Sequence, residues 1–136
     1  MTNSNSSKAM HIALWAAQGI LALILIWGAS VKLFQPLEEV AKMLPWAKEN
    51  PALVKFTGLI DLLGGLGIVL PAALKIRPTL TVFTAYGIAA LMILASIFHV
   101  SRGETSLIGM NIFFLLLAVF VAWGRSKKVI ITPNKN

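Results

Sequence analysis

The sequence predicts an all-α integral membrane protein, a four-helix bundle with both termini in the cytoplasm. Of the 136 residues, 57% are hydrophobic and only 12% are charged, and the mean hydropathy is +0.81. An average soluble domain is about 25% charged, so a soluble monomer of this size would have to bury more apolar side chain than its core can hold. The apolar residues also form four blocks of about twenty residues, the length that a helix needs to cross a bilayer.

We expect these membrane spans at residues 12–34, 52–74, 79–99 and 106–123. Only Gln18, Ser30 and Lys32 interrupt the first block, which is too long for a signal-peptide core, so we expect it to be retained as a helix. Breakers separate the blocks: prolines at positions 36, 45, 51, 71 and 78, and the turn at 101–103. We expect residues 1–125 to form a single domain and residues 126–136 a basic cytoplasmic tail.

The distribution of Lys and Arg predicts the orientation. Four crossings place both termini on one side, and the segments on that side carry seven of the 12 basic residues and no acid: Lys8, Lys75, Arg77, Arg125, Lys127, Lys128 and Lys135. The opposite side balances its basic residues against glutamates. The positive-inside rule therefore predicts cytoplasmic termini. Because the cations lie at helix ends without aromatic interleaving, we expect anionic lipid headgroups and no nucleic acid as their partner.

The first outer loop is the only connection with room for structure. Residues 37–44 place apolar side chains at helical spacing, with Glu38, Glu39 and Lys42 on the other face. We expect a short amphipathic helix on the outer surface, followed by Trp46 as an interfacial anchor.

Each span carries polar groups on one seam of small residues. A charged residue at the bilayer centre costs about 2.5 to 3.5 kcal/mol, so polar groups mark the face that turns inward. The seams run through positions 18, 21, 25, 28 and 32; 58, 61, 65 and 68; 85, 89, 92, 96 and 99; and 111, 115, 118 and 122. Most polar groups fall in the outer half of the bundle, and the inner half offers only Gln18 and Tyr86. The sequence therefore predicts a shared polar pocket in the outer half.

The candidate residues for ligand binding or proton handling are Lys32, Asp61, His99, Arg102 and Asn111, with Gln18, Tyr86, Ser96 and Glu104 as secondary candidates. Each also has a structural interpretation. Asp61 could form a helix-locking ion pair with Lys32 or Arg102, or could be protonated and hydrogen-bonded to Asn111. Lys32 could instead reach the outer headgroups. Capping or a solvated ion pair could account for His99, Arg102 and Glu104.

Several chemistries are excluded by residue type. The chain has no cysteine, and so no disulfide, thiol nucleophile or cysteine-ligated metal. His11 and His99 lie at opposite ends of the bundle, which argues against a bis-histidine haem. We expect no metal site, because too few ligands lie within reach of one another. The Gly-rich run at 64–67 lies inside a span and indicates packing, not phosphate binding.

The motifs, taken together and in order, resemble the DoxX-like family over about Trp15 to Arg125. They are Pro-Trp-x4-Pro at 45–51, G-x-x-D-x-x-G-G-L-G-x-x-L-P at 58–71, H-x-x-R-G-E at 99–104, the asparagine at 111 and A-x-G-R at 122–125. The resemblance implies a four-helix membrane bundle with its functional pocket at Lys32, Asp61, His99, Arg102 and Asn111. Many relatives carry Glu where this chain has Asp61, which keeps the carboxylate but shortens its reach.

The resemblance implies no single activity. Members are linked to thiosulfate:quinone oxidoreductase subunits, to membrane complexes that resist oxidative stress and, in distant animal relatives, to chaperones for acetylcholine receptors. We expect an accessory protein of a bacterial cytoplasmic membrane, whose pocket binds a small amphipathic ligand or a partner helix. It would act with a membrane or redox partner protein or as a homo-oligomer.

Two alternatives remain open. The first is a membrane subunit of a quinone-linked oxidoreductase, in which Lys32, His99 or Arg102 would hydrogen-bond quinone carbonyls and Asp61 would relay protons. The second is a small-solute transporter working as an oligomer. No cofactor is evident in the sequence, and a quinone is the one that the first alternative would require.

Overall fold

The computed structural model describes residues 4–133, and every regular element in that range is helical. The long helices are α1 (Ser4–Phe34), α3 (Pro51–Leu74), α4 (Thr79–Ser101) and α5 (Ile108–Trp123). The short elements are α2 (Leu37–Met43), the 3-10 turns η1 (Pro45–Ala47) and η2 (Thr105–Leu107), and the π-helical turn η3 (Gly124–Lys128). The helices α1, α3 and α4, and α5 continued by η3 to Lys128, are long and apolar enough to cross a membrane, which confirms the four-helix membrane bundle.

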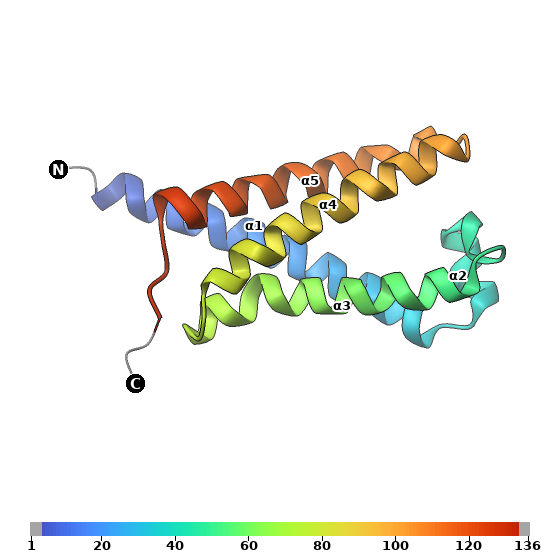
Figure 1. Cartoon of the computed structure of the whole chain (residues 1–136), viewed down its shortest axis with the longest axis horizontal. Coiled ribbons are helices and arrows are strands. Elements are labelled where there is room, and N and C mark those ends of the chain that lie inside the picture. The colour runs from blue at the N-terminus through green and yellow to red at the C-terminus, as the bar shows by residue number, and fades with distance from the viewer. Residues whose placement is uncertain (1–3, 134–136) are drawn as a thin grey trace.

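The helices pack as two hairpin-like pairs, α1 with α3 and α4 with α5 (Figure 1). The start of α1 and the residues after α5 lie at one end of the bundle, which we call the terminal end, and α2 lies at the other, the α2 end. The α2 end corresponds to the side predicted as outer. α1 starts at Ser4 instead of near residue 12, so it extends beyond the expected span at the terminal end.

The seams predicted from the sequence turn inward. None of their members is exposed, whereas large apolar side chains such as Leu23, Phe83 and Leu116 cover the outside of the bundle. A membrane helix buries polar and small residues against its neighbours and leaves apolar ones to the lipid. Gln18 and Asp61 therefore lie in the interior, whereas a soluble protein would expose such polar residues to water.

Glycines allow α1 and α3 to approach closely. A Cβ at Gly58 would lie 2.9 Å from the Cβ of Lys32, and a Cβ at Gly65 would lie 2.6 Å from Cγ1 of Ile26. Real Cβ atoms do not approach so closely, so only glycine fits at either position without a shift of α1. The contact at Gly58 also holds the α1 backbone at Lys32 against α3.

Pro71 lies inside α3 and removes one helical hydrogen bond. It lacks the N–H that would donate to the carbonyl of Gly67 four residues earlier. The Thr81 hydroxyl, from α4, lies 3.4 Å from that carbonyl oxygen, and Gln18 Nε2 of α1 donates to the next carbonyl, that of Ile68, at 2.7 Å. Neighbouring helices therefore satisfy the backbone around the proline, as the apolar membrane interior requires.

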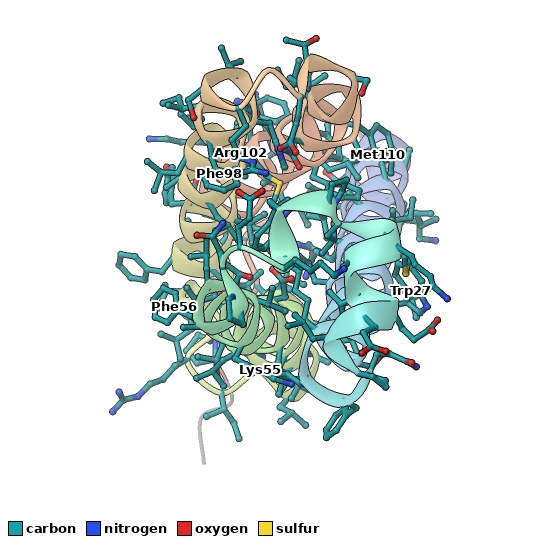
Figure 2. The ribbon with its side chains drawn as sticks, turned by 90° about the vertical axis from the view of Figure 1, so that its right-hand side faces the viewer. Trp27, Lys55, Phe56, Phe98, Arg102 and Met110 are labelled. Carbon is teal, nitrogen blue, oxygen red and sulfur yellow. The ribbon has the colours of Figure 1, made fainter. Side chains whose placement is uncertain are left out.

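The segment from α2 to α3 covers the centre of the α2 end (Figure 2). α2 has the expected amphipathic character, with Val40 buried and Glu38 and Glu39 exposed. Trp46, expected as an interfacial anchor, is instead only 6% exposed and packs edge-on against Phe98, with ring centroids 5.7 Å apart. This difference arises because η1 folds back over the bundle and buries Trp46 against α4.

Candidate functional site

An ion pair joins α1 to α3 in the α2 half of the bundle. Lys32 Nζ donates to Asp61 Oδ2 at 2.8 Å, and the two side chains are 17% and 9% exposed. A Cβ at Gly28 would lie 3.7 Å from the same carboxylate oxygen, an ordinary contact distance, so the α1 backbone passes directly beside the pair. Of the partners considered for Asp61, the structure therefore selects Lys32.

This pair lines a partly open cavity of about 560 Å³, to which all four long helices and the α2–η1 segment contribute. Four of the five main candidates contribute to its wall: Lys32, Asp61, His99 and Asn111. The rest of the lining is apolar and strongly aromatic, with Trp27, Trp46, Phe56, Phe98 and Phe114. A mostly apolar cavity of 300 to 1,000 Å³ with a few convergent polar groups is the usual form of a small-molecule site.

Two hydrogen-bond donors in the cavity wall have no partner. Trp46 Nε1 and Asn111 Nδ2 are both buried without a hydrogen bond. Leaving a buried donor unsatisfied costs about 1 to 3 kcal/mol, and such exceptions in a folded protein call for an explanation. Acceptor oxygens of a bound molecule could satisfy such groups.

A second polar network lies beside the cavity. Glu104 Oε1 lies 3.0 Å from His99 Nδ1 and accepts from Arg102 Nε at 3.2 Å, and Arg102 Nη1 donates to Glu49 Oε2 at 2.9 Å. This network joins the α4–α5 turn to the residues that precede α3. Arg102 lies over the ring of Phe98, 5.6 Å from its centroid, and both are labelled in Figure 2.

Charge and hydrogen bonding within this network shift two pKa values. The hydrogen bond with His99, and after it the contact with Arg102, lower the pKa of Glu104 below its ordinary value. The hydrogen bond to Glu49 is the main cause that raises the pKa of Arg102. Arg102 does not line the cavity itself, but it contacts two residues that do, Phe98 directly and His99 through Glu104.

The secondary candidate residues lie in different parts of the bundle. Glu104 belongs to the network just described. Ser96 is tied to its own helix through the carbonyl of Met92, at 2.8 Å, and does not line the cavity. Tyr86 is 58% exposed on the outside of α4, and Gln18 is fully buried in the terminal half.

Three polar participants escaped the sequence analysis. The sequence predicts Trp46 at the interface and does not single out Glu49. The expectation that only Gln18 and Tyr86 occupy the terminal half is wrong, because Arg125 there is 3% exposed and donates to Gln18 Oε1 at 2.8 Å. The glycine before Arg125 is the feature of the sequence that could have indicated its burial. A Cβ at Gly124 would collide with the side chain of Leu14, so the chain packs tightly against α1 at this point.

Four membrane-spanning helices around a mostly apolar cavity define a small polytopic membrane protein. No group of three or more potential metal ligands occurs among the described residues. Residues 16–121 match the DoxX-like family, and the chain belongs to this family. No curated protein and no solved structure was found to match the chain. The family match includes every residue that lines the cavity.

Proposed function

We propose that this protein is an accessory membrane protein that binds a small amphipathic ligand in the cavity beside Asp61. The observation that carries this proposal is the pair of unpartnered N–H donors, Trp46 Nε1 and Asn111 Nδ2, in the wall of a mostly apolar cavity of about 560 Å³. An apolar wall favours a hydrocarbon ligand, and the two donors favour a polar head with acceptor oxygens.

The charges around the cavity favour an uncharged head. The one cation in its wall, Lys32, is neutralised by Asp61 at 2.8 Å. Binding an anion there would set it beside the Asp61 carboxylate in a medium of low dielectric, where like charges repel strongly. A carbonyl, ester or ether oxygen can accept from Trp46 and Asn111 without this penalty.

The ligand's tail has a path out of the cavity. A second hollow of about 220 Å³ lies between α3 and α4 and shares Leu25, Ile60 and Leu91 with the main cavity. Gly64 and Gly87 also line this hollow. A single hydrocarbon chain could run from the cavity along this groove toward the middle of the membrane.

A quinone is one ligand of this description, and it would make the protein a membrane subunit of a quinone-linked oxidoreductase. The residues fit such a ring, because Trp46 and Asn111 could each donate to a carbonyl oxygen. Lys32 and His99 also line the cavity, whereas Arg102, the other donor considered from the sequence, does not. Electron transfer would require a redox partner protein.

The orientation and the membrane that we propose rest on the distribution of charge and on the family. We place the terminal end in the cytoplasm because its cations have no acidic counterpart in the sequence. A DoxX-like chain of this orientation fits the cytoplasmic membrane of a bacterium.

The test is native mass spectrometry of protein extracted gently from its own membrane. The wild type should carry a co-purifying mass, and Asn111→Leu, which removes the unpartnered donor, should lose it. Ser96→Ala is the matched control, since its hydroxyl bonds within α4 and does not line the cavity. A stoichiometric protein partner or homo-oligomer without any small molecule would overturn the proposal in favour of an assembly surface. Solute flux in liposomes would do so in favour of a transporter.

A further inference from the structure

A second unusual polar site lies at the terminal end, away from the cavity beside Asp61. Arg125 is 3% exposed, yet all its partners are neutral groups or an imidazole. Its Nε donates to Gln18, Nη1 lies 2.9 Å from His11 Nδ1 and 3.3 Å from the carbonyl oxygen of Val129, and the guanidinium lies 5.3 Å from the ring centroid of Trp15. Its Nη2 is buried without a hydrogen-bond partner.

No acidic side chain is near enough to neutralise Arg125. The chain has five acids, and all belong to the α2 half of the bundle or its loops: Glu38, Glu39, Glu49, Asp61 and Glu104. The terminal end instead adds further cations: Lys8, Lys75, Arg77, Lys127 and Lys128. Burying a guanidinium without a counter-charge is unfavourable, so a bound anion would stabilise this end of the protein.

A cavity adjoins Arg125. It measures about 320 Å³ and lies between the first two turns of α4 and the segment that follows α5. Arg125, Ser126 and Thr79 bring polar groups to its wall. Phe83 and Tyr86, which also line it, are 68% and 58% exposed on the membrane-facing side of α4. The cavity is therefore cationic at the end of the bundle and aromatic toward the bilayer.

We propose that this cavity binds an anionic phospholipid from the leaflet at the terminal end, with the phosphate against Arg125 and an acyl chain along Phe83 and Tyr86. Arg is suited to phosphate because its planar fork donates several charge-assisted hydrogen bonds, and Nη2 is free to donate one. Basic pockets between transmembrane helices are typical sites for anionic headgroups. A lipid is favoured over a free anion because the cavity opens beside exposed apolar rings. This site does not depend on the ligand proposed for the other end of the bundle.

The experiment titrates delipidated protein in a neutral detergent with phosphatidylglycerol or with phosphatidylcholine of the same acyl chains, and follows bound lipid by native mass spectrometry. The wild type should prefer phosphatidylglycerol. Arg125→Gln should weaken phosphatidylglycerol binding about tenfold or more, the effect of losing a charged hydrogen-bond donor. Lys127→Gln removes the same charge from an exposed side chain outside the cavity and should change binding less than about threefold.

A second variant keeps the test decisive if Arg125→Gln fails to fold. Val82→Trp fills the cavity while leaving Arg125 in place, and should also abolish the preference for phosphatidylglycerol. Val119→Trp, at a half-exposed position of α5 outside the cavity, should retain it. Equal binding of both lipids by the wild type, or an unchanged preference in Val82→Trp, would overturn the proposal. Displacement of phosphatidylglycerol by inorganic phosphate alone would overturn the lipid as the occupant.

Discussion

Lys32 and Asp61 form the one ion pair between long helices that the described residues show, with Nζ and Oδ2 2.8 Å apart across the α1–α3 contact. Gly58 makes this geometry possible, since it lets the α1 backbone approach α3. The pair therefore has two roles, holding the two helices together and forming the polar wall of the cavity.

Replacing one member of the pair should destabilise the bundle more than replacing both. Asp61→Asn leaves a lysine without its counter-charge in a largely buried position, and should cost about 2 to 3 kcal/mol. Adding Lys32→Met should recover at least half of that loss, because no unpaired charge remains. Thermal unfolding of the single and double variants in one detergent measures this.

The reverse order, with the double variant less stable than Asp61→Asn, would show that Lys32 is held by other contacts. One candidate is the ring of Trp46, whose centroid lies 6.0 Å from Lys32 Nζ.

Helical periodicity and the cost of polar groups in lipid explain why much of the fold and part of the site were predictable. Together they fix which face of each helix turns inward, so Lys32, Asp61, His99 and Asn111 could be assigned to one half of the bundle and all four line the cavity there. The partner of Asp61 was not predictable, since Lys32 and Arg102 lie at similar depth. Lys32 is the partner of Asp61 because the close contact at Gly58 brings α1 against α3.

The residues that escaped prediction lie where the chain leaves regular spans. Trp46 is buried because η1 folds back over the α2 end, and Glu49 meets Arg102 through the same fold. Arg125 is buried because α5 continues into η3 and closes on α1 at Leu14. Such contacts depend on how a loop or a helix end packs in the folded protein. Neither helical periodicity nor hydropathy predicts that packing.

The groove between α3 and α4 should be open to a ligand's hydrocarbon tail. A Cβ at Gly87 would meet no atom within 4 Å, although Gly87 lines the hollow. Gly87→Leu should therefore leave the fold intact and fill the groove. It should weaken ligand binding about tenfold, the approximate value of burying a few methylene groups. The measurement is the fraction of protein that retains the co-purifying mass in native mass spectrometry.

Gly19→Leu is the matched control for this variant. Its Cβ also meets open space, but Gly19 lies on α1 and lines none of the cavities described above. Equal ligand occupancy in the two variants would place the tail elsewhere.

The network around Glu104 should make stability depend on acid pH. The hydrogen bond with His99 and the contact with Arg102 lower the pKa of Glu104 in the folded chain from its ordinary value of 4.5. Its contribution to stability is therefore complete above pH 4.5, declines below that pH as the unfolded chain takes up a proton first, and is lost once the pH falls below the folded pKa.

Glu104→Gln should lower the melting temperature at pH 7 and should flatten its decline between about pH 5 and pH 3.5. Thermal unfolding across that range compares this variant with the wild type and with Glu38→Gln, which alters an exposed acid of α2. If Glu104→Gln declined as steeply as Glu38→Gln, the acid sensitivity would have to come from another carboxylate, with Asp61 the next to replace.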